Sequence, residues 1–349
     1  MNQFTKRQIH FDILRITATA AVMILHISGQ HLRQSGFTSA EWHFFNFYNS
    51  IVRWAVPIFT MISGALFLSR NDCIEKLFKK NIFRIFTAFC FWSLVYAIFA
   101  YFTGTSLVLS VKRFFTGNFH LWFLFMIAGL YMMVPFLKKI AEHDRLMKYF
   151  FVLAIIFNFF LPQLQTVLSL SFTEAGNILR AILSSAHINF VLGYTFYFLL
   201  GYYLNSIHIN QKEFSVIKIV GIIGFLYTIL MSEITAKSCG QPSTIFYDNF
   251  TLNVLLESVF VFLLFKKHFQ HITFSKKTSH ILFQLSAYSF GAYLIHAMII
   301  DLLDLCFHLN TLTFYPALST PIIFIIVFLL SFAISALLNK LPFLKKYIV

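Results

Sequence analysis

Charged residues are scarce in this sequence. Only 11% of the 349 residues are Asp, Glu, Lys or Arg, whereas 58% are hydrophobic and 19% are aromatic. A soluble domain of this length needs far more charge to cover its surface. We therefore expect lipid to be the solvent for most of the chain.

Acidic residues are scarcer still, with 13 Asp and Glu against 27 Lys and Arg, which gives a formal net charge of +14. Such an excess can indicate nucleic-acid binding. Here, however, the basic residues cluster in short connections between apolar stretches, which is typical of membrane topology. The distribution predicts no nucleic-acid partner.

Cysteine is also rare and lacks any useful spacing. Cys73, Cys90, Cys239 and Cys306 form no CxxC or CxxH pattern, so the sequence predicts neither a metal site nor thiol redox chemistry. No internal repeat is visible either. Secondary transporters commonly contain such repeats, so their absence weighs against that class.

Apolar stretches long enough to cross a bilayer recur along the whole chain. They predict an all-α integral membrane protein with about ten transmembrane helices and a single domain over residues 1–349. The segment 164–187 is expected to hold a short interfacial helix or part of a longer loop. The predicted spans are 9–30, 50–69, 82–103, 119–137, 147–163, 188–207, 216–235, 250–266, 281–300 and 319–338.

Lys and Arg alternate strongly between the two sets of connections. By the positive-inside rule, the richer set faces the cytoplasm, which places both termini there in a multi-pass protein of the inner membrane, surrounded by membrane lipids. The poorer set holds Arg33, Arg53, Lys112, Arg113, Arg180 and Lys237. The richer set holds Lys6, Arg7, Arg70, Lys76, Lys79, Lys80, Arg84, Lys138, Lys139, Arg145, Lys148, Lys212, Lys218, Lys266, Lys267, Lys276, Lys277, Lys340, Lys345 and Lys346.

The first span contains two ionisable residues that need a reason, because charge inside a bilayer is costly. Arg15 and His26 are eleven residues apart, which is three helical turns plus about 20°, so both lie on one face about 16 Å apart. Asp12 is close enough to Arg15 to pair with it. The alternative is an arginine that reaches the interface and a histidine satisfied by a neighbouring helix.

Two further ionisable residues lie in or near spans. Glu257 has no evident partner in the sequence, so it pairs with an arginine, stays protonated or marks the path of a substrate. Arg53, beside Trp54, either contacts a substrate or extends to the interface. Ser63 and Gly64 in the second span indicate close helix packing.

Four motifs carry a resemblance to a known family. The first span has the pattern R-x10-H within FDILRI…H, and RWAVPIFTMISGALFL follows at 53–68, HLWFL at 120–124 and SFGAYLIH at 289–296. Together and in this order, they resemble the membrane-bound acyltransferase 3 family. The first two resemble in particular the subgroup that includes the O-acetyltransferase of enterobacterial common antigen.

The resemblance implies transfer of an acetyl group from cytoplasmic acetyl-CoA, used as a cosubstrate, to a hydroxyl of a cell-envelope glycan or lipid-linked glycan. It implies that His26 is the catalytic base and that Arg15 positions the acyl-CoA donor. The family often has a basic run after the second span, which corresponds here to Lys79, Lys80 and Arg84 as donor-binding residues. Asn81 stands where that run has an arginine.

Contacts with the acceptor are expected from residues toward the other side of the membrane, namely His120, Trp122, His296, Arg53 and Glu257. Ser289, Tyr293 and His296 recur at helical spacing, so they line one face. For Ser289 and Tyr293, helix-packing hydrogen bonds are the other interpretation. Trp122 fits an interfacial aromatic residue equally well.

Two other functional classes stay open at this point. Ten spans with intramembrane Arg, His and Glu also suit a secondary transporter or a flippase for an envelope precursor. A receptor or scaffold without catalysis is the third class, although it gives no reason for the alignment of Arg15 with His26. Dependence on acetyl-CoA distinguishes the transferase from both.

Overall fold

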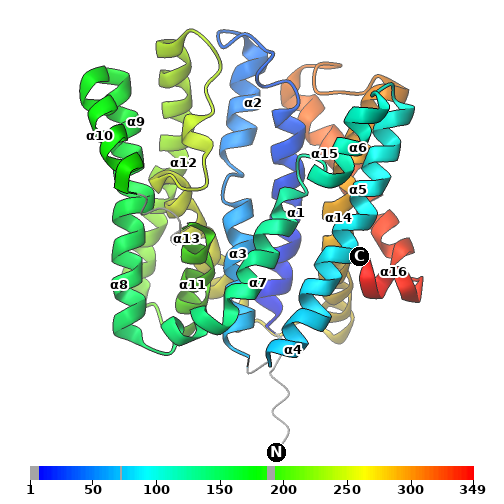
Figure 1. The fold of residues 1–349 in the computed structure, drawn as a ribbon, viewed down its shortest axis with the longest axis horizontal. Coiled ribbons are helices and arrows are strands. Elements are labelled where there is room, and N and C mark those ends of the chain that lie inside the picture. Colours follow the sequence, from blue (N-terminus) through cyan, green and yellow to red (C-terminus); the bar gives the residue numbers. More distant parts are fainter. Residues whose placement is uncertain (1–7, 71–72, 187–192) are drawn as a thin grey trace, which may run out of the picture.

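The computed structural model describes residues 8–70, 73–186 and 193–349, and over these residues the chain forms helices and no strands. Nine helical segments within the described residues are long and apolar enough to cross a membrane. They run between two ends of one bundle (Figure 1). We call the end where α1 (Ile9–Gly29) begins the lower end, and the end where α1 finishes the upper end. The prediction of an all-helical membrane protein is confirmed.

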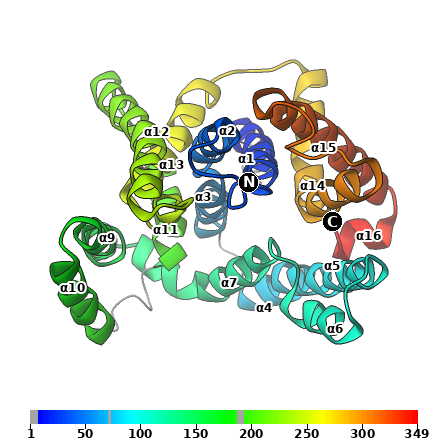
Figure 2. The ribbon, with the colours of Figure 1, turned by 90° about the horizontal axis from the view of Figure 1, so that it is seen from above.

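Helix α1 occupies the middle of the bundle, and the remaining helices are arranged around it (Figure 2). It packs against α13 (Leu252–Phe269), α14 (Lys276–Phe307) and α15 (Pro316–Leu338). Its apolar side chains are consequently shielded on several sides, and Leu14, Met23 and Ile27 are fully buried. Any polar group on this helix must therefore contact protein or a cavity rather than lipid.

The second predicted span is a broken helix. α2 (Ala40–Ser50) lies above α3 (Ala55–Leu68), and residues 51–54 separate them (Figure 1). Ser39 caps α2 by accepting from the Trp42 N–H at 3.2 Å. The predicted start at residue 50 was wrong. Asn46, Asn49 and Ser50 of α2 are buried within the protein, so hydropathy alone underestimates the length of this span.

Glycines allow α3 to approach α11 (Gly193–Ser206) with backbones nearly touching. A Cβ at Gly64 would lie 1.8 Å from the Phe198 carbonyl oxygen, and one at Gly201 would lie 2.0 Å from that of Met61. The close packing expected at Ser63–Gly64 is confirmed. The predicted span 188–207 is described from Gly193 onward, and residues 188–192 lie outside the described residues.

The segment after residue 163 continues as helix. α8 (Asp144–Ala154), the π-helix η2 (Ile155–Phe160) and α9 (Leu161–Ser171) form one rising rod, and α10 (Thr173–Ala186) turns back beside α9. This pair lies at the periphery of the bundle (Figure 2). Segment 164–187 is thus helical as far as Ala186 rather than a short interfacial helix or a loop, and residue 187 lies outside the described residues.

The other elements complete the ring. α4 (Ile74–Lys76) and the π-helix η1 (Leu77–Ile82) lead into α5 (Phe83–Phe102), and α6 (Leu107–Thr116) precedes α7 (Trp122–Ala141). α12 (Gln211–Cys239) is followed by the short 3-10 helix η4 (Ile245–Tyr247), and α16 (Pro342–Tyr347) follows α15. Helix α16 packs on α5, where Thr87 Oγ1 donates to the Tyr347 carbonyl at 2.6 Å.

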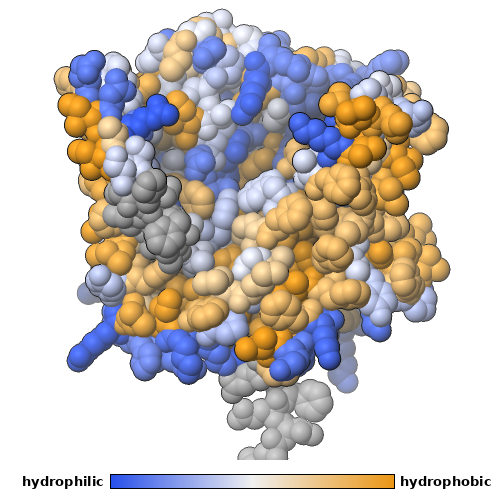
Figure 3. Space-filling model, in the orientation of Figure 1, coloured by the Kyte–Doolittle hydropathy of each residue, from blue (hydrophilic) through white to orange (hydrophobic). Residues whose placement is uncertain are grey.

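The surface agrees with a membrane setting. On the face shown in Figure 3, hydrophobic residues form a broad band across the middle of the molecule, with hydrophilic residues above and below it. Large apolar side chains on the outside of the bundle, such as Phe102, Leu226 and Leu329, are more than half exposed. Such exposure is expected where lipid covers the surface. The cytoplasmic location of the termini remains a prediction.

Candidate active site

Two separate cavities enter the bundle from its two ends. The upper cavity has a volume of about 620 Å³ and contains His26 near the end of α1. Its polar lining includes amide, hydroxyl and carboxylate groups together with two arginines. The lining residues are Leu25, His26, Gly29, Gln30, Leu32, Arg33, Asn49, Arg53, Phe119, Thr244, Tyr247, Asp248, Asn249, Ala297, Ile300 and Asp301.

The lower cavity, of about 480 Å³, has a different character. Four basic side chains line it, and none of its described lining residues is acidic; the basic residues are Arg15, Arg70, Arg84 and Lys345. Ser63, Ser286, Ser289 and Tyr131 add hydroxyl groups. A cavity with several guanidinium groups and no carboxylate is suited to a ligand with several negative charges.

Arg15 and His26 lie on the same face of α1, as their spacing predicted. Arg15 Nη1 donates to Ser286 Oγ at 3.1 Å, and the His26 ring stacks on that of His296 with centroids 5.2 Å apart. Both partners belong to α14. The two residues nevertheless line different cavities, Arg15 the lower and His26 the upper. The reading of Arg15 as a residue that only reaches the interface does not fit this contact.

A layer of rings lies between the two cavities. We define the aromatic layer as Phe59, His120, Phe123, Tyr293 and His296. Tyr293, which lines the lower cavity, is 5.7 Å from His296, and His296 is 5.2 Å from His26 in the upper cavity, measured between ring centroids. Only two ring-to-ring steps therefore separate the two cavities.

Backbone contacts fix the state of two histidines in this layer. His296 Nδ1 lies 2.5 Å from the Tyr293 carbonyl and His120 Nε2 lies 3.2 Å from the Leu294 carbonyl. A carbonyl only accepts, so these nitrogens carry the protons, and the opposite nitrogen of each neutral ring is an acceptor. His296 Nε2 and His120 Nδ1 are buried without a hydrogen-bond partner among the described residues. Both are available to accept a proton or a donor group.

The basic run after the second span divides between cavity and surface. Arg84 lines the lower cavity, lies over the Phe290 ring at 5.5 Å and donates from Nη2 to the Val349 carbonyl. Lys79 and Lys80 are exposed and do not line either cavity. Asn81 lines the lower cavity, so the position where the family often has an arginine presents an amide there.

The residues expected to contact the acceptor separate in the same way. His120 and His296 belong to the aromatic layer, and Arg53 lines the upper cavity. Trp122 is 40% exposed, packs against Tyr194 on the outside and lines neither cavity. Glu257 is fully buried, where Oε1 accepts from Thr228 at 2.5 Å, away from both cavities.

Several lining residues were missed by sequence reasoning. Arg70 directly follows the second span and Lys345 lies near the end of the chain, so both read as ordinary topological charges. Tyr247 and Asp301 line the upper cavity but lie in the short 3-10 helix η4 and in a long apolar span, respectively. Only Arg70 carried a usable signal, because it is adjacent to the RWAVPIFTMISGALFL motif.

The comparison with known families agrees with this arrangement. A model of the acyltransferase domain of the acyltransferase 3 family matches residues 9–340, nearly the whole chain. The chain belongs to the acyltransferase 3 family. No curated protein and no solved structure matches it. In this multi-pass membrane acyltransferase, Arg15 lines the lower cavity and His26 lines the upper cavity.

Proposed function

We propose that this acyltransferase moves an acetyl group from acetyl-CoA in the lower cavity to a hydroxyl of a cell-envelope glycan or lipid-linked glycan in the upper cavity. One observation carries the proposal. A cavity lined by four cations and a cavity that contains His26 meet at a single aromatic layer.

The lower cavity suits coenzyme A because that molecule carries several phosphate charges at one end and the thioester at the other. Arg84 and Arg70 near the mouth would hold phosphate groups, with bidentate geometry open to each guanidinium. Arg15 is placed deeper, about 16 Å from His26 by helical rise, so it would position the donor rather than touch the reacting carbonyl. This separation is comparable to much of the flexible arm of coenzyme A.

The chemistry assigns His26 the role of base. The neutral imidazole takes the proton of the acceptor hydroxyl as its oxygen attacks the thioester carbonyl, which forms a tetrahedral intermediate. The C–S bond then breaks, and the thiolate leaves with the proton that His26 returns. The products are the O-acetyl ester and coenzyme A. His296 supports the His26 ring by stacking from α14.

The acceptor side of the proposal has two supports. The upper cavity presents amides, carboxylates and hydroxyls, which are the groups that bind sugar hydroxyls. The motifs in the first and second spans resemble the subgroup that acetylates enterobacterial common antigen. The excess of basic residues at the lower end would place the donor cavity in the cytoplasm and the protein in the inner membrane.

A transporter or flippase for an envelope precursor is the second candidate. The break between α2 and α3 is the observation that favours it, since discontinuous helices are common at transport sites. Family membership and the acid-free lower cavity favour the transferase. A transferase consumes acetyl-CoA, whereas a transporter does not.

The first prediction tests the catalytic role of His26. His26→Ala should lower acetyl transfer from radiolabelled acetyl-CoA in membranes by about 10²- to 10⁴-fold, the usual contribution of a general base. Mass spectrometry of envelope glycans should lose the acetylated species. His280→Ala, which removes an exposed histidine of α14, is the matched control and should leave transfer unchanged. Near-normal transfer by a well-inserted His26→Ala protein would remove His26 from the mechanism.

A further inference from the structure

Arg53 lies in an unusual setting for a charged side chain. It occupies the break between α2 and α3 and lines the upper cavity together with His26. Among the described residues it forms no ion pair, and its Nε is buried without a hydrogen-bond partner. A charge withdrawn from water normally has a counter-ion, because its desolvation is costly. The carboxylates of Asp248 and Glu257 act on Arg53 electrostatically, but neither forms an ion pair with it among the described residues.

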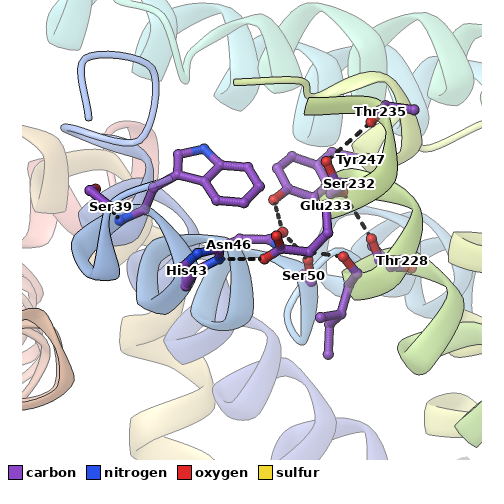
Figure 4. Close-up of polar contacts among 11 residues, drawn as sticks. Ser39, His43, Asn46, Ser50, Thr228, Ser232, Glu233, Thr235 and Tyr247 are labelled. Carbon is purple, nitrogen blue, oxygen red and sulfur yellow. Dashed lines mark hydrogen bonds and ion pairs between the residues drawn. The ribbon is translucent and has the colours of Figure 1, made fainter. Parts of the chain in front are cut away.

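The guanidinium is nevertheless held firmly. It lies over the Tyr247 ring at 4.0 Å from the centroid, and Nη1 donates to the Tyr247 carbonyl at 3.5 Å. The Tyr247 hydroxyl in turn donates to Asn46 Oδ1 (Figure 4). Arg53 is therefore fixed through its neighbour rather than free to extend to the interface.

Asn46 anchors this arrangement to α12. Its Nδ2 donates to Glu233 Oε1 at 3.0 Å, and Glu233 also contacts His43 Nδ1 at 2.8 Å (Figure 4). Ser50 Oγ donates to Asn46 Oδ1 at 3.1 Å. Asn46 is fully buried, and both its amide nitrogen and its amide oxygen form hydrogen bonds, as buried polar groups usually do. This network joins α2 to α12 and holds Tyr247 under Arg53.

The surroundings of Arg53 define what it would bind. A second cation, Arg33, lines the same cavity and is exposed at its mouth. Asp248 and Asp301 also line it, and Asp248 Oδ1 already accepts from the Phe250 N–H at 2.8 Å. Carboxylates and the Asn49 amide suit hydroxyl groups, whereas two guanidinium groups suit an anion.

We propose that the upper cavity selects a sugar that carries an anionic group, a carboxylate or a phosphate, and that Arg53 with Arg33 binds that group. This inference rests on the proposed function only in taking the upper cavity as the acceptor site. The anion would form the direct ion pair that Arg53 lacks among the described residues, and the carboxylates and amides of the lining would hold the hydroxyls. Asn46 and Glu233 are positioning residues, because they act on Arg53 through Tyr247.

The test measures binding directly, with purified protein in detergent and no donor. The probes are p-nitrophenyl glucuronide, glucose 1-phosphate and, as the neutral reference, p-nitrophenyl glucoside. We expect at least one anionic probe to bind at least tenfold more tightly than the glucoside. Arg53→Gln should abolish this preference, and Arg53→Lys should retain part of it because the charge remains. Arg180→Gln, which removes an exposed arginine outside both cavities, should leave it unchanged.

Asn46→Ala should weaken the preference without removing the charge, and a normal size-exclusion profile shows that each variant is folded. Tighter binding of the glucuronide identifies a carboxylate, and tighter binding of the phosphate identifies a phosphate. Equal binding of all three probes, binding of none, or an unchanged preference in Arg53→Gln would overturn the inference. Equal losses of acetyl transfer to neutral and anionic sugars in Arg53→Gln, without any change in binding, would also overturn it by assigning Arg53 to the transition state.

The same experiment separates the inference from the proposed function. An Arg53-dependent preference for anionic sugars in a protein that transfers no acetyl group would support the inference and defeat the proposed function. Acetyl transfer without any preference for anionic sugars would support the proposed function and defeat the inference.

Discussion

Arg84 and Lys80 lie four residues apart in a single basic run, yet they face different surroundings. Arg84 lines the lower cavity, while Lys80 points outward from the π-helix η1. At the level of single residues, we therefore expect donor binding to depend on which cations line the cavity rather than on how many cations a connection contains.

This difference gives a matched pair of variants. Arg84→Gln should raise the apparent KM for acetyl-CoA by roughly tenfold or more, because a charge-assisted hydrogen bond to phosphate contributes about 1.5–3 kcal/mol. Lys80→Gln should leave that KM unchanged, since an exposed cation outside the cavity adds little. Initial rates at varied acetyl-CoA provide the comparison. Equal effects of the two substitutions would argue for a diffuse electrostatic role of the whole run.

Arg15 allows a finer test of the same cavity. Arg15→Lys keeps the charge but loses the planar fork that contacts Ser286, so it should impair donor use more than a charge-only account predicts. We expect the apparent affinity for acetyl-CoA to fall in Arg15→Lys and to fall further in Arg15→Ala. An unchanged affinity in Arg15→Ala would exclude Arg15 from the donor site.

Part of this candidate site could be predicted from the sequence. The eleven-residue spacing of Arg15 and His26 placed both on the face that contacts α14, because helical geometry is regular. The pairing of His26 with His296 across the bundle needed the tertiary structure. Tyr247 lies in the short 3-10 helix η4, whose place in the bundle no local sequence pattern indicates.

At the scale of elements, the bundle depends on two helices that touch through glycine. Gly64 and Gly201 leave no room for a methyl group between α3 and α11, since the added atom would meet backbone rather than a flexible side chain. Helix α3 directly follows the break that contains Arg53, and it carries the ring of Phe59. The packing of α3 against α11 therefore supports both the break and the aromatic layer.

Gly64→Ala should destabilise the folded protein by about 1–3 kcal/mol, the usual cost of overpacking, or more. Gly129→Ala in α7 is the control, because nothing lies within 4 Å of its added Cβ, and it should be neutral or slightly stabilising through helix propensity. Thermal unfolding in detergent compares the two. A midpoint for Gly64→Ala equal to that of the parent protein would contradict the close packing.

Hydropathy predicted the helical elements well where they are largely apolar, as in α1, α5 and α15. It failed at α2, where Asn46 and Asn49 are buried and hydrogen-bonded to other helices, and the exposed His43 contacts Glu233. It also failed at α10, which is too amphipathic for a transmembrane window. The errors of the hydropathy prediction occur where side chains contact neighbouring helices or solvent rather than lipid.

At the scale of the whole molecule, the central feature is the pair of cavities on opposite sides of one aromatic layer. The lower end carries the phosphate-compatible cations and the upper end carries His26 with polar groups for an acceptor. An acyl group that reaches His26 from the lower cavity must pass His120, Tyr293 and His296. The transferase would thus pass only an acyl group from one side of the membrane to the other, without moving a whole substrate across.

The most direct test of this claim uses sealed proteoliposomes that contain acceptor only in the lumen and receive radiolabelled acetyl-CoA only from outside. Protein molecules with the lower end facing outward should produce acetylated acceptor in the lumen, and His26→Ala should produce none. Blocking outward-facing lower ends with an impermeant lysine reagent identifies the orientation that works. Product formed only when donor and acceptor share one compartment would contradict the account.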